Sequence, residues 1–251
     1  MGAEHKVRWQ SAGVMLGALL IVGLLDIKFL SWAFFGFILY FAIDEAVELF
    51  GVESNLIYPI GAVVWIFAYF FSEPINLIFV ALLILASKLA YDKSIDKTLF
   101  LPLLYPLTSW LFIWSLYIHF GMKSLVWLLV IVALSDVGAY YVGKSIGKTK
   151  FSPTSPNKTL EGVIGGIAIA SFIGAIVIAS GSEIGFFLAL IVSALTSIAS
   201  IFGDLFESYL KREAGVKDSG DLIPGHGGIL DRVDGYLFAS VMLYIILTIG
   251  K

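Results

Sequence analysis

The sequence predicts an all-α, polytopic integral membrane protein. Of its 251 residues, 59% are hydrophobic and only 14% are charged. The mean hydropathy is +0.94, and long apolar runs recur along the chain between short polar breaks. A soluble domain of this composition would lack the polar residues needed to cover its surface. We therefore expect the apolar runs to form helices within a bilayer, and the composition argues against a nucleic-acid partner.

Nine apolar runs approach the length of about 20 residues that a helix needs to cross the hydrocarbon. They cover residues 11–25, 29–43, 56–71, 75–91, 99–120, 124–142, 162–180, 184–202 and 235–250. The first two runs are short and only three residues separate them, so one tilted helix or a re-entrant pair is an alternative there. The first run follows basic residues, as in a signal peptide, but it lacks a convincing cleavage site. We interpret it as a retained helix.

Lysine and arginine predict the orientation. With nine spans and the N-terminus in the cytoplasm, the breaks at 44–55, 92–98, 143–161 and 203–234 are cytoplasmic. Those breaks and the N-terminal segment carry twelve basic residues, against three on the opposite side, which is a clear positive-inside bias. The twelve are Lys6, Arg8, Lys93, Lys97, Lys144, Lys148, Lys150, Lys158, Lys211, Arg212, Lys217 and Arg232; the three are Lys28, Lys123 and Lys251. The 44–55 break carries only acidic charges, which weigh little in this rule.

The composition changes near residue 130. Residues 1–125 are predicted to be an N-terminal transmembrane anchor and scaffold, with few polar residues inside the spans. Residues 126–251 are predicted to be a catalytic transmembrane region that carries two long polar loops. The chain contains no cysteine, which excludes disulfides, thiolate catalysis and cysteine-ligated zinc.

The first polar loop and its flanks read SDVGAYYVGKSIGKTKFSPTSPNKTLEGVIGG, from Ser135 to Gly166. Asp136 lies just inside the end of a predicted span, where an ionisable group is usually functional; a helix–helix hydrogen bond or an interfacial carboxylate is the alternative. Asn157 or Thr159 is expected to cap the next helix, whose free N–H groups would face a phosphate beside Lys158. Lys158 could instead serve only as a positive-inside determinant.

The second polar loop reads GDLFESYLKREAGVKDSGDLIPGHGGILDRVD, from Gly203 to Asp234. It gathers seven carboxylates, four basic residues and a histidine in a chain with few charges. If the preceding span continues as a helix, one of its faces carries Asp204, Glu207, Ser208 and Lys211, at positions i, i+3, i+4 and i+7. This stripe offers a metal ligand, a hydroxyl and a cation, although a salt-bridged surface helix is an equal alternative. We expect ordered turns at 217–220 and 224–228.

Together, the two segments resemble the bacterial phosphatidate cytidylyltransferases, also called CDP-diacylglycerol synthases. The resemblance rests on the motifs S-D-x-x-A-Y, S-P-N-K-T-x-E-G and S-Y-L-K-R-x4-K-D-S-G-x2-I-P-G-H-G-G-I-L-D-R-V-D, and it covers roughly residues 130–240. It implies transfer of a cytidylyl group from CTP to phosphatidic acid, which releases pyrophosphate and CDP-diacylglycerol and requires Mg²⁺. It also implies a bacterial inner-membrane enzyme, with a homodimer as the expected assembly.

The chemistry needs charge neutralisation rather than a protein nucleophile, because phosphatidate already carries an anionic phosphate. Asp204 and Asp231 are the preferred magnesium ligands, followed by Asp234 and Asp136, and a second cation is an open alternative. The resemblance implies that lysines and arginines hold phosphate oxygens. The remaining catalytic and substrate-binding candidates are Lys158, Lys211, Ser208, Lys144, Ser155, Thr159, Arg212, Lys217, Asp218, His226, Gly227, Gly228 and Arg232. His226, taken alone, would more often be structural.

Two other functions fit parts of the sequence. A CTP-dependent lipid kinase, of the dolichol or phytol kinase type, would use the same nucleotide and release CDP, but residues 217–234 argue against it. A transporter would carry its ionisable groups near the midplane of broken helices, whereas here they cluster at one predicted membrane face. A CDP-alcohol phosphotransferase would need a different aspartate spacing after residue 234.

Overall fold

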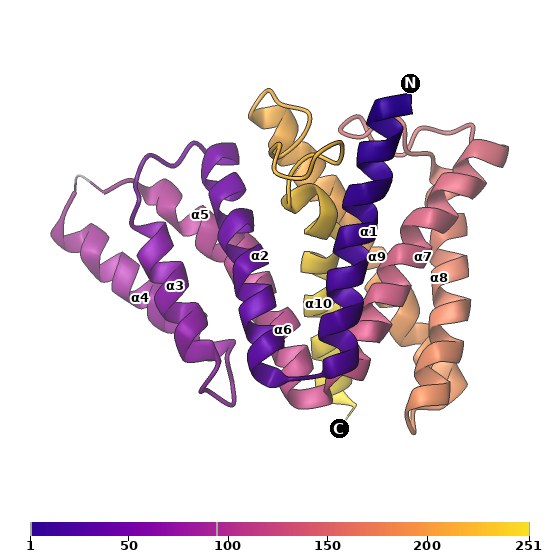
Figure 1. Cartoon of the computed structure of the whole chain (residues 1–251), viewed down its shortest axis with the longest axis horizontal. Coiled ribbons are helices and arrows are strands. Elements are labelled where there is room, and N and C mark those ends of the chain that lie inside the picture. Colours follow the sequence, from indigo (N-terminus) through magenta and orange to yellow (C-terminus); the bar gives the residue numbers. More distant parts are fainter. Residues whose placement is uncertain (1, 94, 251) are drawn as a thin grey trace. The chain divides into compact units, whose positions relative to one another are not determined.

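The computed structural model describes residues 2–93 and 95–250, which form helices joined by short loops (Figure 1). The helices are α1 (Gly2–Leu25), α2 (Lys28–Leu49), α3 (Ile57–Ala68), α4 (Asn76–Tyr91), η1 (Lys97–Leu99), α5 (Phe100–Pro102), η2 (Leu103–Thr108), α6 (Ser109–Phe120), α7 (Met122–Ile146), α8 (Leu160–Gly181), α9 (Phe186–Glu213) and α10 (Leu230–Ile249). Across this described part the only β-type pairings are two isolated bridges, Lys150 with Thr159 and Ile223 with Gly227. The predicted all-α class is confirmed there.

Within the described residues, six helical segments are long and apolar enough to cross a membrane. They are Lys28–Leu49, Lys97–Phe120, Met122–Ile146, Leu160–Gly181, Phe186–Glu213 and Leu230–Ile249. Three further apolar helices are shorter: Trp9–Leu25, Ile57–Ala68 and Asn76–Tyr91. Each of the nine predicted runs therefore lies on a helical segment, while the count of nine spans stays a prediction. The first two runs are not one continuous helix, because the chain breaks at Asp26, whose φ is 44°.

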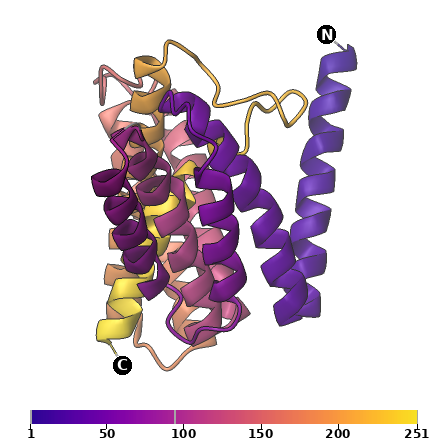
Figure 2. The same ribbon diagram turned by 90° about the vertical axis from the view of Figure 1, so that its left-hand side faces the viewer.

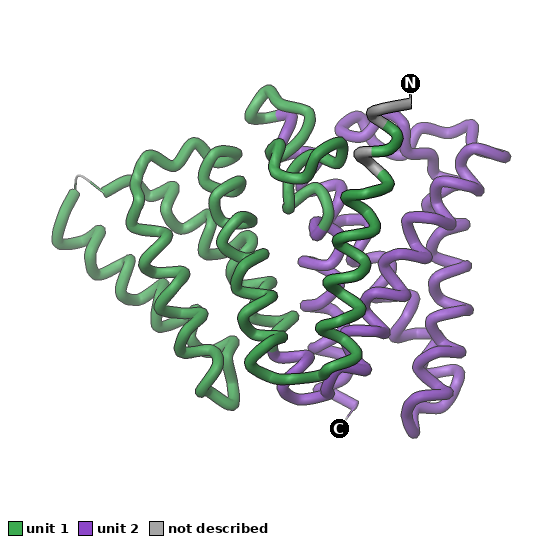
Figure 3. Tube along the Cα trace, in the orientation of Figure 1, with its two compact units in different colours: residues 1–114, 213–232 green, residues 115–212, 233–251 purple. Residues whose placement is uncertain are grey.

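The chain divides into two compact units (Figure 3). The first contains the residues up to Trp114 together with Glu213–Arg232, and the second contains Ser115–Arg212 together with the residues from Val233 onward. The loop between α9 and α10 thus belongs with the N-terminal helices. The division into a scaffold and a catalytic region near residue 125 stays a functional prediction.

Tryptophans hold the first unit together. Trp32 and Trp65 stack at 6.5 Å, and each indole N–H donates to the backbone carbonyl of the other residue, at 2.9 and 3.2 Å. The indoles of Trp110 and Trp114, both buried, donate to Phe35 O and Ala68 O. A buried indole combines a large apolar area with a donor that needs a partner, so these contacts fix the packing of α2, α3 and α6 within this unit.

Small residues set the packing in the second unit. The Cα of Gly166 lies 3.1 Å from where a Cβ on Gly138 would stand, and a Cβ on Gly162 would come within 2.6 Å of Ala139 O. Helices α7 and α8 therefore approach as closely as their backbones allow, as is common in membrane proteins, and they run side by side in Figures 1 and 2. A hydrogen bond of 2.9 Å between the buried hydroxyls of Ser197 and Ser135 joins α9 to α7.

Candidate active site

The second unit contains a cavity of about 490 Å³ that collects charged residues from three places in the sequence. Helix α7 contributes Asp136, Ala139, Tyr140, Gly143 and Lys144; the following loop and the start of α8 contribute Ser155, Asn157, Lys158, Thr159 and Val163; α9 contributes Ile201 and Asp204. A volume of several hundred Å³ with a few convergent polar groups is typical of a small-molecule site. Residues of the first polar loop thus line one cavity together with Asp204.

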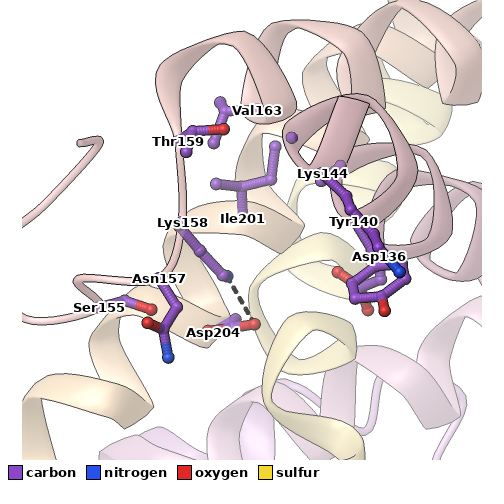
Figure 4. A pocket seen from close by; sticks show the side chains of 12 residues that line it. Asp136, Tyr140, Lys144, Ser155, Asn157, Lys158, Thr159, Val163, Ile201 and Asp204 are labelled. Atoms are coloured by element: carbon purple, nitrogen blue, oxygen red, sulfur yellow. Dashed lines mark ion pairs between the residues drawn. The ribbon is translucent and has the colours of Figure 1, made fainter. Parts of the chain in front are cut away.

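An ion pair joins the loop to α9 inside this cavity (Figure 4). Lys158 Nζ lies 2.6 Å from Asp204 Oδ2, and the two side chains are 25% and 26% exposed. The hydroxyl of Ser208, one turn further along α9, donates to Asp204 Oδ1 at 3.4 Å. Asp204 thus faces the cavity with two side-chain partners, and both of them are candidate phosphate contacts.

A second cation lies across the cavity from this pair. Lys144 Nζ stands 5.7 Å from the centre of the Tyr140 ring, and Figure 4 shows both side chains beside Asp136. Lys144 and Asp136 are exposed, so a ligand can reach them. The cavity therefore offers one lysine and one carboxylate on each side, a combination that suits a metal-bound phosphate.

The loop that carries Lys158 is held at both ends. Thr159 caps α8 by accepting a hydrogen bond of 3.2 Å from Gly162 N, as predicted. Glu161 accepts hydrogen bonds from Lys148 N and from the backbone and hydroxyl of Thr149. These bonds and the Lys150–Thr159 bridge join the two ends of the loop at residues 148–161. They fix the position from which Lys158 extends.

Helix α9 continues past the predicted span to Glu213, which confirms the helical stripe from Asp204 to Lys211. The end of this stripe that carries Lys211 is buried, however. Lys211 Nζ lies 2.7 Å from Glu207 Oε2, and the two side chains are only 11% and 0% exposed. The salt-bridged alternative is thus correct for this pair, but the pair is buried rather than on the surface. Any phosphate contact by Lys211 stays a prediction.

Asp231 lies in the first unit, at the start of α10, and organises the loop before it. Its Oδ2 atom accepts hydrogen bonds from Ser219 N at 2.9 Å, Ser219 Oγ at 3.0 Å and Gly228 N at 2.8 Å. The loop also contains the predicted turn at 224–228, in which Ile223 N bonds Gly227 O. Gly225 and Gly227 have φ values of 76° and 80°, a region that favours glycine.

Comparison with known proteins decides the family. The model of the cytidylyltransferase family matches residues 6–250. The chain is 41% identical to the phosphatidate cytidylyltransferase of Helicobacter pylori (strain ATCC 700392 / 26695) over 97% of this chain and 92% of the relative. It is 37% identical to the phosphatidate cytidylyltransferase of Thermotoga maritima over 71% of this chain and 70% of the relative.

The chain belongs to the cytidylyltransferase family. This confirms the resemblance read from the motifs between residues 130 and 240, and extends it to the N-terminal helices, which the motifs did not cover.

The structure brings some predicted site residues together and leaves others apart. Asp136, Lys144, Ser155, Lys158, Thr159 and Asp204 line one cavity. Asp234, on α10, lies close enough to Asp204, Glu207 and Asp136 for their charges to act on it. Other candidates lie in or next to the loop between α9 and α10. Arg212 at the end of α9, Lys217 and Asp218 in the loop, and Arg232 on α10 are exposed, whereas His226 and Gly227 are half-buried.

One residue in the loop's environment was missed from the sequence. Glu45, near the end of α2, is only 6% exposed and lies against the loop of the first unit. Ser219 Oγ, Ile229 N and Leu230 N donate to its carboxylate. The signal in the sequence was a carboxylate just after the end of an apolar run, in a break that carries no cation.

Proposed function

We propose that this chain transfers the cytidylyl group of CTP to phosphatidic acid, giving CDP-diacylglycerol and pyrophosphate. The observation that carries the proposal is the cavity in which Lys144 and Lys158 stand beside Asp136 and Asp204. The names of the relatives from Helicobacter pylori and Thermotoga maritima support the choice of substrates. The chain contains the paired cations and carboxylates that phosphoryl chemistry requires.

In this reaction a phosphate oxygen of phosphatidate attacks the α-phosphorus of CTP, and the bond from that phosphorus to the oxygen bridging to the β-phosphate breaks. Both reacting partners are anions, so the protein must reduce their repulsion and align them. Lys158 and Lys144 hold phosphate oxygens. The Ser155 and Thr159 hydroxyls are further phosphate contacts in the same cavity. The leaving pyrophosphate is already anionic and requires no protein acid.

We propose Mg²⁺ as the cofactor. Among residues 2–93 and 95–250, no group of three His, Asp or Glu side chains is arranged for a metal ion. Mg²⁺, however, commonly takes only one or two carboxylates and completes its shell with water and substrate phosphates. The carboxylates of Asp204 and Asp136, in a cavity with lysines, fit such an ion; when bound, it neutralises charge on the phosphates. Asp234 and Asp231 are further candidate ligands, and a second cation stays a prediction.

The membrane setting is the finer part of the proposal. Six helices fit a multi-pass membrane protein, and we propose the bacterial inner membrane, with the N-terminus and both polar loops in the cytoplasm, where CTP is available. The basic residues of those loops support this orientation. We propose a homodimer as the working assembly.

A labelling experiment tests the reaction. Detergent-purified protein is incubated with Mg²⁺, phosphatidate and CTP labelled at either the α- or the γ-phosphate. We expect the α-label in the lipid and the γ-label in pyrophosphate. A CTP-dependent lipid kinase would instead place the γ-label in the lipid and release CDP, and that result would overturn the proposal.

A further inference from the structure

The loop between α9 and α10 is anchored by a buried carboxylate from a distant part of the sequence. Glu45 Oε1 accepts a hydrogen bond of 2.6 Å from Ile229 N, and Oε2 accepts bonds of 2.8 Å from Leu230 N and from Ser219 Oγ. Ile229 and Leu230 supply N–H groups at the start of α10, which have no acceptor within the helix. Glu45 therefore caps α10 from another helix, and its charge suits the positive end of the helix dipole.

The loop backbone is built to fit around this carboxylate. A Cβ on Gly228 would collide with the Glu45 carboxylate and with the Ser219 hydroxyl, and a Cβ on Gly220 would come within 2.9 Å of Glu45 Oε1. A Cβ at either position would therefore require the Glu45 carboxylate to shift from its present place. Gly228 is one of the residues of the P-G-H-G-G turn, so the sequence of the turn and the position of Glu45 depend on each other.

Ser219 links Glu45 to Asp231. Its hydroxyl lies 2.8 Å from Glu45 Oε2 and 3.0 Å from Asp231 Oδ2, and it accepts a hydrogen bond of 3.2 Å from Asp231 N. A hydroxyl has one proton, so it can donate to only one of the two carboxylates at a time. Buried carboxylates are costly unless several donors satisfy them. Here backbone N–H groups supply most of the donors, so the order of the loop and the charge of the two acids are coupled.

We infer that Glu45 is a positioning residue for the reaction: it holds residues 217–231 in the conformation that binds substrate phosphates. The inference rests on the proposed function, since Lys217, Asp218 and His226 are substrate-binding candidates only in that context. The Glu45 carboxylate ties the loop at residues 219, 229 and 230, beside the turn at 223–227 and a bond of 3.1 Å from Ser11 Oγ to Pro224 O. Loss of the Glu45 anchor should therefore loosen the loop while the helices remain folded.

The test compares Glu45→Gln with Glu48→Gln. Glu48 is on the same helix but exposed. Because both substitutions replace Glu with Gln, the two variants make the same change in charge. A Gln at position 45 can present only one oxygen, and its amide NH₂ would face a donor. We expect Glu45→Gln to raise the KM for CTP, lowering kcat/KM about ten- to hundredfold, with a smaller change in the KM for phosphatidate. Simple loss of folded protein would lower kcat and leave both KM values unchanged.

Limited trypsin digestion provides a measurement that does not depend on activity. Arg212, in the last turn of α9, and Lys217, in the loop, are exposed cleavage points, and we expect faster cleavage there in Glu45→Gln than in Glu48→Gln. If the two variants match in both cleavage rate and KM for CTP, the inference is wrong. If Glu45→Gln cannot be purified folded, Ser219→Ala decides by the same two measurements, and wild-type values would overturn the inference. An inactive wild-type protein would contradict the proposed reaction, while the cleavage comparison would still test the anchor.

Discussion

The carboxylates of the two units differ in the kind of group that they bind. In the second unit, Asp204 is paired with a lysine side chain and, at 3.4 Å, with a serine hydroxyl. In the first unit, Glu45 and Asp231 are bound mainly by backbone N–H groups. A lysine is a mobile cation on a flexible stem and can exchange one anion for another. Backbone N–H donors are held in place by the chain, so they cannot exchange one anion for another.

This difference assigns different roles to acids that are indistinguishable in the sequence. On the proposed function, we expect Asp204 to release Lys158 to a phosphate and to bind a metal ion without disturbing its helix. Glu45 and Asp231 cannot exchange the backbone N–H groups that they bind for another ligand without disrupting the loop that they hold. A pair that is about a quarter exposed contributes little to stability, whereas leaving buried donors without an acceptor is expensive. Substitutions in the two regions should therefore separate catalysis from loop order.

The largest effect is expected at Asp204, whose lysine partner can exchange one anion for another. Asp204→Asn should lower kcat at least about a thousandfold, because it removes several kcal/mol of charge stabilisation in the transition state. Its free energy of unfolding should change by less than about 1 kcal/mol, and trypsin cleavage of the loop should stay at the wild-type rate. Steady-state kinetics, chemical denaturation and digestion measure the three quantities. Asp221→Asn, at an exposed position, is the control. Activity of Asp204→Asn within about tenfold of wild type would exclude Asp204 as a ligand.

A smaller effect is expected at Lys158, the ion-pair partner of Asp204. Lys158→Met should lower kcat/KM about a hundredfold, because the phosphate loses a cation. Lys158→Arg should stay within about tenfold of wild type, because the charge remains although the guanidinium has a different shape. Lys150→Met provides a matched control in the same loop, at an exposed position. If Lys158 only determines topology, the two methionine variants will have equal kinetics, and its assignment to phosphate binding will be wrong.

Local features of the fold were predictable from the sequence. Every predicted apolar run lies on a helical segment, because hydropathy over such a run depends on neighbouring residues alone. The cap at Thr159 and the continuation of α9 to Glu213 were predicted for the same reason, since caps and helical spacing are local patterns. The motif residues between 136 and 204 converge on one cavity, as expected of a shared site.

The contacts that depend on packing were not predictable. The resemblance implied a phosphate contact for Lys211, but only the tertiary structure shows that its end of the stripe is buried against Glu207. Glu45 lies 174 residues from Ser219 in the sequence. Nothing in the spacing around Glu45 indicates such a partner, so it was counted only as an acidic residue in a loop. Helical periodicity defines faces but does not say which of them becomes interior.

The two polar loops are expected to lie on the same side of the membrane, and this can be tested without a change in activity. The basic residues predict that both polar loops lie on the cytoplasmic side, so the two loops should be accessible from the same side despite their different partners. Because the chain has no cysteine, single cysteines at Lys150 and Asp221, both exposed, report on the two loops separately. An impermeant thiol reagent should label neither in intact cells and both after the membrane is opened, while both variants keep wild-type kinetics. Labelling of either cysteine in intact cells would reverse the orientation of that loop, and labelling of only one would show that the loops face opposite sides and cannot serve one active site.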